Sequence, residues 1–543
     1  MAKPLILSSF LAVLLLSLSP LSLESAPGRR LGSSKRAPCF FGKFSHPHTN
    51  KLSNPRNPKY RYDTRYFDQR LDHFSFADLP NFPQRYLINT EHWVGPARMG
   101  PIFFTAATRG ILSGSPTTPA SFGKSRLALV PWSSSPKLSI MSLKHRYYGE
   151  SMPYGSRDEA YRNATTLAHL TTEQALADFA VLITNLKRNL SAETCPVVLF
   201  GGSYGGMLAA WMRLKYPQIA IGALASSAPV LQFEDIVPPE TFYDIVSNDF
   251  RVRNALTFFF SLTTFHREST SCFNTIKESW DIVEAEGQKK NGLVELTKTF
   301  GLCRVIELND RKLERSEDLS DWLDSAYSYL AMANYPYPTE FLMPLPGNPI
   351  KEVCRKIDSC PDGTSVLDRV FEGVSVYYNY TGEVDCFELD DDPHGMDGWN
   401  WQACSEMVMP MSSTRDSSMF PEYNFSYSLF EEGCWNDYRV KSRPTWITTE
   451  FGGHGFKAAL KIFGSNIIFS NGLLDPWSGG SVLGNISKSI IALVTEKGAH
   501  HIDLRAATVN DPDWVVEQRA AEVKVIEGWI KDYYQEKKAV FDM

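Results

Sequence analysis

The stretch PVVLFGGSYGGMLAAWM, residues 196–212, decides the fold of this 543-residue chain. It begins with the short apolar run 196–200, which is typical of a buried β-strand. Residues 201–206 follow with the pattern Gly-x-Ser-x-Gly around Ser203, and an apolar helical pattern resumes at Met207. A strand, a tight glycine turn and a helix in this order predict that Ser203 stands on a strained turn above the edge of a sheet.

The neighbouring segments continue this alternation of strands and helices. Apolar residues recur at helical spacing over 168–190, behind Thr171 and Thr172, which suit a helix N-cap. We expect a strand within 219–228 and two later strands at 466–469 and 490–494. A closing helix carries these residues on one face: Val516, Val523, Ile526, Ile530 and Tyr533. The fold class that this order predicts is α/β, with an α/β-hydrolase core.

Residues 233–444 have a different character from the predicted core. They follow a mostly helical pattern that is interrupted by prolines and carries most of the cysteines. A chain of this length also exceeds what one hydrophobic core usually supports. We therefore expect a core made of residues 63–232 and 445–543, split by a helical cap domain at 233–444.

The first 62 residues carry the marks of targeting and processing. Lys3 precedes an apolar run over 5–19 that is too short to span a bilayer comfortably, so residues 1–26 are expected to be a signal peptide. An uncleaved anchor is the alternative. Residues 27–62 contain two basic pairs and are expected to be a propeptide or flexible tail. The protein is then expected in the secretory pathway, and finally in a lysosome, a vacuole or the extracellular space.

Entry into an oxidising compartment favours disulfides among the nine cysteines. Seven of them lie in the middle stretch: Cys272, Cys303, Cys354, Cys360, Cys386, Cys404 and Cys434. The count is odd, and Cys39 is a candidate for loss with the propeptide. The sequence leaves the pairing open. Five sequons predict glycosylation sites: Asn163, Asn189, Asn379, Asn424 and Asn485.

Two further segments supply partners for a serine nucleophile. Asp475 lies in a loop with glycine and proline after the strand at 466–469, and His500 and His501 follow the strand at 490–494. In an α/β-hydrolase the acid follows the serine and the histidine comes last, so Ser203, Asp475 and His500 are the expected triad, with His501 as the alternative base. The backbone N–H of Tyr204 is the expected oxyanion donor. Asp475 could otherwise belong to an ordinary turn. The two histidines could otherwise bind a metal, but no partner ligands occur at metal spacing, and we predict no metal site.

At these residues the sequence resembles the prolyl carboxypeptidase and dipeptidyl peptidase II family of serine peptidases. The matching runs are 70–74, 145–151, 201–211, 470–480 and 498–505. The resemblance implies an α/β-hydrolase domain with a helical cap, the triad given above, cleavage next to proline, and no metal or organic cofactor. The runs 403–410 and 443–449 favour the carboxypeptidase branch.

Three alternatives to a carboxypeptidase stay open on the sequence. A dipeptidyl peptidase would remove N-terminal X-Pro pairs. A catalytically impaired secreted relative would keep the fold and only bind. An acyl-ester hydrolase would fit the serine turn alone, although the longer matching runs argue against it.

Five residues are expected to contact substrate. Met207 lies one helical turn beyond Ser203 and Trp477 two residues beyond Asp475, where they could form a compact apolar pocket for a prolyl ring or simply pack in the core. Met409 lies in the matching run 403–410 and is assigned to the same pocket. His501, if protonated, and Arg505 could donate charge-assisted hydrogen bonds to a terminal carboxylate. Pairing of Arg505 with Asp503 or with a surface carboxylate is the alternative.

The segment 105–143 departs from the family pattern. Codons that can encode residues 105–110, when read one nucleotide earlier, give Tyr-Cys-Gly-Asn-Glu-Gly, which is family-like. The run 121–126 becomes family-like under the same shift. We therefore expect that the segment is a frame-shifted or mis-spliced translation. It follows the strand 102–104, so we expect a loop that begins with residues 105–107, and in this fold that loop supplies the second oxyanion donor.

Charge and composition restrict the partners. The net charge is −6 and no long basic run occurs, so a nucleic-acid partner is not expected. No later segment is long and apolar enough to be a membrane helix, so no membrane contact is expected after signal cleavage. The expected partners are peptides with proline near one terminus, with a homodimer left open.

Overall fold

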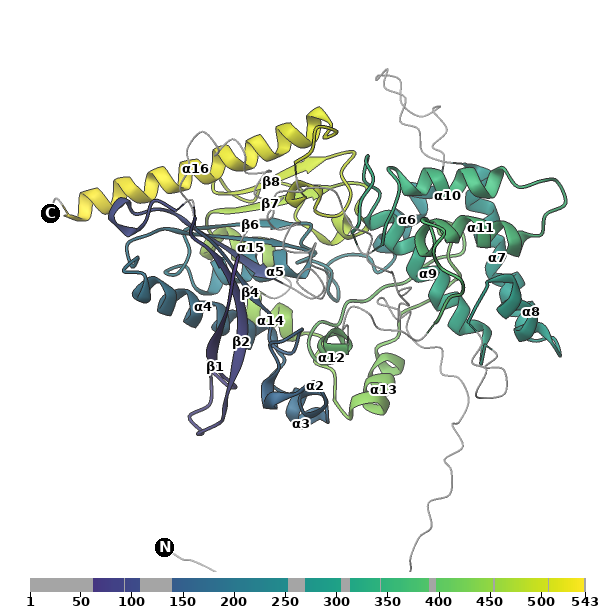
Figure 1. Cartoon of the computed structure of the whole chain (residues 1–543), viewed down its shortest axis with the longest axis horizontal. Helices are drawn as coiled ribbons and strands as arrows, with labels where there is room; N and C mark the ends of the chain where they lie inside the picture. The colour runs from purple at the N-terminus through teal and green to yellow at the C-terminus, as the bar shows by residue number, and fades with distance from the viewer. Residues whose placement is uncertain are drawn as a thin grey trace, which may run out of the picture.

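The computed structural model describes residues 62–91, 93–107, 139–251, 269–303, 313–341, 343–389, 397–452, 455–505 and 507–541. Within these ranges eight strands form one sheet: β1 (Asp63–Arg70), β2 (Asn81–Asn89), β3 (Ile102–Ala107), β4 (Ser139–Lys144), β5 (Val197–Gly202), β6 (Gly222–Ser226), β7 (Ile467–Gly472) and β8 (Ile490–Thr495). Their order is β1-β2-β4-β3-β5-β6-β7-β8 (Figure 1). The pairs β1–β2 and β2–β4 are antiparallel, and every later neighbour is parallel.

Both faces of the central strands are buried, so these strands are continuously apolar. Val197 and Leu199 of β5 belong to a large cluster on one face, while Val198 and Phe200 belong to a second cluster on the other. This alternation is the two-residue period of a strand. The carboxyl ends of the parallel strands therefore meet at one edge, where the turn at Ser203 and the two later loops emerge.

Helices cover the two faces of the sheet. α4 (Thr172–Asn189), α5 (Tyr204–Lys215), α14 (Trp446–Phe451) and α15 (Phe456–Phe463) contribute to the large cluster. α16 (Asp513–Phe541) covers the other face through Ile526, Trp529 and Ile530 and runs along one side of the sheet in Figure 1. Short helices α2 (Arg157–Ala160) and α3 (Ala164–Leu167) lie near the antiparallel end.

A second group of helices lies between β6 and β7 in the sequence. It comprises α6 (Thr241–Phe250), α7 (Thr270–Gly287), α8 (Gly292–Thr299), α9 (Ser316–Met332), α10 (Pro349–Asp358), α11 (Val366–Tyr378), α12 (Asp397–Ser405) and α13 (Tyr427–Tyr438). α6 to α11 gather beyond one end of the sheet around an apolar cluster of their own (Figure 1). These helices therefore form a cap over an α/β-hydrolase core.

Three disulfides join helices and loops of this inserted stretch. They are Cys272–Cys354, Cys303–Cys386 and Cys404–Cys434. Cys360, which we expected among the stapled cysteines, is free, and so is Cys195, which is buried in the core. Cys39 lies outside the described residues. Among the described helices, none has both the length and the apolar character needed to cross a bilayer.

Most predicted elements are confirmed, with two corrections. The helix predicted behind Thr171 is α4, and the Thr171 side chain accepts from the Gln174 N–H. In the closing helix Val523 and Ile526 are buried, but Val516 is 54% exposed, so it does not belong to the apolar face. Thr105 to Ala107, which we expected to begin a loop, extend β3. Strand pairing decides this, because Thr105 lies in register with Phe200 of the neighbouring β5.

Candidate active site

Ser203 lies between the last residue of β5 and the first of α5, in the position predicted from the sequence. Its φ of 59° is the left-handed region, which is costly for a residue with a side chain. The glycines around it permit the turn, because a Cβ on Gly201 would lie 1.9 Å from the Gly205 carbonyl oxygen. The Ser203 N–H donates to the Ser226 carbonyl at 2.9 Å, which ties the turn to β6.

Asp475 and His500 are joined by a direct hydrogen bond. The Nδ1 of His500 lies 2.9 Å from Oδ2 of Asp475, and both side chains are almost fully buried. The other carboxylate oxygen, Oδ1, accepts from the Trp477 N–H at 3.1 Å. Both oxygens of Asp475 are therefore occupied, and the bond at Nδ1 leaves Nε2 of His500 available to exchange a proton.

Close backbone approaches bring the two loops together beside the serine turn. A Cβ on Gly472 would lie 2.1 Å from the Gly498 carbonyl oxygen, so the ends of β7 and β8 can converge only without side chains there. The residue before Ser203 touches the histidine loop, since a Cβ on Gly202 would lie 3.0 Å from Cδ2 of His501. The His501 N–H donates to Oγ of Ser227, at the end of β6, at 2.7 Å.

Residues of the cap hold the backbone of His500, and sequence reasoning missed them. The His500 N–H donates to the Met332 carbonyl at 3.1 Å, and the hydroxyl of Tyr335 donates to the His500 carbonyl at 2.7 Å. Met332 also contacts the site through its sulfur, which accepts from Nε1 of Trp477 at 3.1 Å. No local pattern links these residues, because more than 140 positions separate each pair.

The predicted apolar pocket residues occupy different environments. Met207 is fully buried in the core cluster, which is the packing alternative considered above. Trp477 belongs to the cap cluster and packs edge-on against Phe242, with ring centroids 5.0 Å apart. Met409 is half-buried and packs against both clusters. Trp477 and Met409 thus lie where core and cap meet, whereas Met207 lies within the core cluster.

The environment of His501 differs from our expectation. Burial, and then the neighbouring His500 and Arg505, hold the pKa of His501 well below its usual value, which opposes the protonated form. Arg505 is half-buried over the Phe341 ring, 4.3 Å from guanidinium carbon to ring centroid, and it donates to Oγ1 of Thr339 at 3.2 Å. The carboxyl of Asp503 instead accepts from the Ser226 hydroxyl. Of the two predicted donors, His501 and Arg505, Arg505 is therefore the one that carries a positive charge.

Four of the five sequon asparagines are exposed: Asn163, Asn189, Asn424 and Asn485. Asn379 is half-buried, and its amide donates to the Val384 carbonyl and accepts from the Val384 N–H, each at 3.0 Å. A glycan must be attached through the same amide nitrogen. The four exposed sites are therefore better suited to modification than Asn379.

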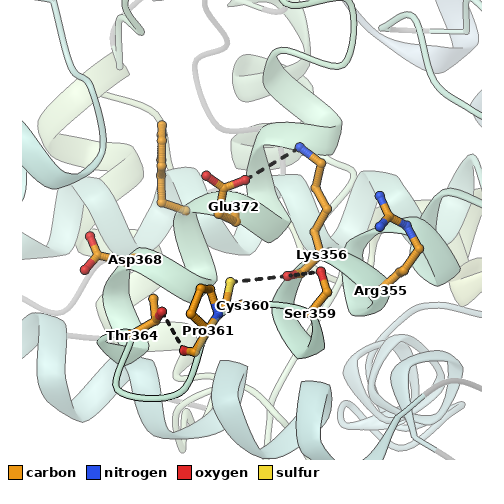
Figure 2. Close-up of a pocket in the computed structure, with 9 residues that line it drawn as sticks. Arg355, Lys356, Ser359, Cys360, Pro361, Thr364, Asp368 and Glu372 are labelled. Atoms are coloured by element: carbon orange, nitrogen blue, oxygen red, sulfur yellow. Dashed lines mark hydrogen bonds and ion pairs between the residues drawn. The ribbon is translucent and has the colours of Figure 1, made fainter.

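A separate cavity of about 490 Å³ lies in the cap between α10 and α11 (Figure 2). It is lined by Arg355, Lys356, Ser359, Cys360, Pro361, Thr364, Asp368, Phe371 and Glu372. Arg355 pairs with Glu352, and the Lys356 ammonium points toward Glu372 at 3.8 Å. The charged side chains that line the cavity are thus largely paired with opposite charges, and none of the predicted site residues lines it. The described residues also contain no group of three or more His, Cys, Asp or Glu side chains that could hold a metal ion.

Most of the segment 105–143 lies outside the described residues, which resume at Ser139. β3 ends at Ala107 and β4 begins at Ser139, pairing in parallel with β3. The loop expected to supply the second oxyanion donor therefore falls outside the described residues.

Comparisons with known proteins point to one family of peptidases. The family model described as serine carboxypeptidase S28 matches residues 69–522. The chain is 38% identical to the lysosomal Pro-X carboxypeptidase of Mus musculus, over 93% of this chain and 96% of that protein. Against the Homo sapiens protein of the same name, identity is 38% over 90% and 92%. A solved peroxisomal alpha-beta-hydrolase from Saccharomyces cerevisiae is 10% identical, covers 86% of this chain and 90% of its own, and has a TM-score of 0.35. The family match extends over most of the chain, and the sheet of this chain carries Ser203 in the turn after β5. This protein therefore belongs to the serine carboxypeptidase S28 family.

Proposed function

We propose that this protein is a serine carboxypeptidase that removes the C-terminal residue following a proline. Ser203 attacks the carbonyl carbon of the proline. Nε2 of His500 takes the serine proton and gives it to the leaving amine, while Asp475 orients and stabilises the imidazole. The same imidazole then takes a proton from the water that cleaves the prolyl ester, and returns it to Ser203. The N–H of Tyr204 donates to the oxyanion, because the first N–H groups of a helix have no intrahelical partner. In this mechanism no metal or organic cofactor takes part.

The observation that carries the proposal is the buried Asp475–His500 hydrogen bond, in a loop that contacts the residue before Ser203. The choice of a Pro-X substrate is supported by the names of the mammalian relatives. Trp477 and Met409, at the junction of core and cap, are suited to a prolyl ring. Arg505 is suited to the free carboxylate of the leaving residue.

The cellular setting belongs to the same proposal. A signal peptide at 1–26, a processed segment at 27–62 and a route to a lysosome fit the lysosomal names of the relatives and the three disulfides. The division into core segments 63–232 and 445–543 around a cap at 233–444 is retained as part of the proposal. The expected partners are peptides, with a homodimer left open.

The test is a set of matched peptides with proline either next to the C-terminus or second from the N-terminus. Release of the residue after the C-terminal proline supports the proposal. Release of an N-terminal X-Pro pair would instead identify a dipeptidyl peptidase.

A further inference from the structure

Tyr204 is the one large side chain in the glycine-rich run 201–206. The glycines allow α5 to approach β5 and β6 closely, but they provide no side chain that could fix the turn. A Cβ on Gly206 would lie 2.8 Å from the Ser226 carbonyl oxygen, so this close approach leaves no room for one. Backbone hydrogen bonds tie the turn to β6, and the Tyr204 side chain is the one large group of the run that can anchor it to the rest of the molecule.

The phenol of Tyr204 is enclosed by groups from three distant parts of the chain. Its hydroxyl accepts from Nε2 of Gln402 at 2.8 Å. It lies 3.1 Å from Oγ1 of Thr172 and 3.4 Å from Nε2 of His145. The ring packs edge-on against Trp399, with centroids 5.3 Å apart. Because Tyr204 is only 2% exposed, these contacts leave its side chain a single position.

The Gln402 amide bridges two phenols. The hydroxyl of Tyr148 donates to Oε1 of Gln402 at 2.8 Å, and the amide nitrogen faces Tyr204. On the other side the hydroxyl of Thr172 donates to Oε1 of Glu406 at 2.8 Å. The oxygen of Thr172 can then accept the proton of Tyr204. One directed chain of hydrogen bonds therefore runs from Tyr148 to Glu406.

The protonation states of the groups around Tyr204 follow from burial. Burial lowers the pKa of His145 to about 4, and its Nδ1 lies 2.8 Å from the Arg146 carbonyl, so neutral His145 presents Nε2 as a second acceptor, beside Thr172, for the single proton of Tyr204. Burial, with a smaller contribution from Glu173, raises the pKa of Glu406 to about 8. Oε1 of Glu406 remains an acceptor in either state. Between these two values the network keeps one protonation pattern.

Gln402 comes from α12, which belongs to the stretch inserted between β6 and β7. Tyr204 begins α5 of the core, directly after Ser203. We infer that Gln402 is a positioning residue, which fixes the Tyr204 oxyanion donor by holding the tyrosine phenol. The inserted stretch then covers the catalytic turn and also supplies a side chain, Gln402, that positions it. This inference rests on the proposed function, because it presumes the roles of Ser203 and of the Tyr204 N–H.

The first variant, Gln402→Met, keeps the length of the side chain and removes both hydrogen bonds. Full loss of an oxyanion donor costs about 10²–10³-fold in turnover, and a displaced donor should cost less, about 10- to 100-fold. We expect kcat for a Pro-X peptide to fall by that factor with KM nearly unchanged. Affinity for a boroproline inhibitor, which forms a tetrahedral adduct on the serine, should fall in parallel.

The second variant, Gln402→Glu, tests the direction of the hydrogen bonds. A protonated carboxyl can accept from Tyr148 and donate to Tyr204, whereas a carboxylate cannot donate. Activity relative to wild type should therefore be retained at low pH and fall toward that of Gln402→Met as pH rises. The groups facing the new carboxyl are His145, Tyr148, Tyr204 and Glu406.

The matched control is Tyr378→Phe, which removes an equally buried hydroxyl that donates to the Trp322 carbonyl within the cap. It should lower the unfolding temperature and leave kcat unchanged. Wild-type kcat in Gln402→Met, or an equal loss of kcat in Tyr378→Phe, would overturn the inference while the proposed function stands. Wild-type protein that does not cleave the peptide, or full activity in Ser203→Ala, would overturn both.

Discussion

At the scale of single residues, the geometry of the site depends on Asp475, because both of its carboxylate oxygens accept hydrogen bonds. Oδ2 of Asp475 bonds His500, and Oδ1 accepts from the Trp477 N–H, in a buried position. Such a carboxylate fixes both the tautomer and the direction of the imidazole. In the proposed mechanism the serine turn provides the nucleophile, and the Asp475–His500 pair activates it.

We therefore predict that Asp475→Asn lowers kcat by about 10⁴-fold, as in other serine peptidases in which the tautomer is lost. The amide of asparagine has only one acceptor oxygen, so it must either leave the Trp477 N–H without an acceptor or present its NH₂ group to Nδ1. Steady-state hydrolysis of a Pro-X peptide gives the measurement, with circular dichroism as the check on folding. A loss below tenfold would remove Asp475 from the triad.

Arg505 tests the recognition of the substrate's end. Its guanidinium lies over Phe341 beside the histidine loop. A charge-assisted hydrogen bond contributes about 1.5–3 kcal/mol, so Arg505→Ala should raise KM for a free-acid peptide about 10- to 100-fold. Cleavage of the corresponding C-terminal amide should change little. An undiminished preference for the free acid in Arg505→Ala would show that another group binds the carboxylate.

At the scale of secondary-structure elements, the contact between the turn Ile502–Leu504 and α16 carries a buried acidic pair. Burial raises the pKa of both Asp503 and Glu522. The charge of Asp503 raises the pKa of Glu522 further, whereas the hydrogen bond from Glu522 favours ionised Asp503. The hydroxyl of Ser226 donates to Asp503, and that of Ser470 donates to Glu522 at 2.7 Å. The guanidinium of Arg519 lies against the same turn through the Asp503 carbonyl at 2.9 Å.

This pair predicts stability that declines as pH rises. The folded state retains protons that the unfolded chain releases near the ordinary carboxyl pKa values of about 4, so stability is lost above that pH until the raised pKa values are passed. Glu522→Gln keeps the acceptor for Ser470 and removes one charge. Its unfolding temperature should therefore vary less than that of wild type between pH 5 and pH 8.

The matched control is Glu517→Gln, on the exposed side of the same helix. It should show the wild-type dependence on pH. Differential scanning calorimetry gives the unfolding temperature at each pH. If Glu522→Gln and Glu517→Gln both showed the wild-type dependence of this temperature on pH, the buried pair would not contribute to that dependence.

The elements also show what the sequence could and could not predict. The strands around Ser203, Asp475 and His500 were predictable because buried parallel strands are short apolar runs that end in turn residues. The exposure of Val516 could not be predicted, because the helical period alone does not say where α16 leaves the sheet. The contacts of Met332, Tyr335 and Gln402 were also unpredictable, since cap and core meet only through the tertiary fold.

At the scale of the whole molecule, we expect the segment 105–143 to determine how active the written chain is. We predict that a chain in which residues 105–110 are replaced by Tyr-Cys-Gly-Asn-Glu-Gly, and the rest of the segment is restored to the shifted frame, turns over about 10²–10³-fold faster than the chain as written. The gain is expected because the loop after β3 supplies the second oxyanion donor. Equal activity of the two chains, with an intact transcript encoding the written segment, would refute the frame-shift hypothesis.

Even with one oxyanion donor missing, turnover by Ser203 should remain measurable. The most direct test of the central claim is the rate at which the chain as written releases the last residue from a peptide ending in Pro-Phe, compared with Ser203→Ala prepared in the same way. Our account predicts release of phenylalanine by the first protein and a rate lower by about 10⁴-fold or more in the second. Release at a similar rate from Ser203→Ala would contradict it.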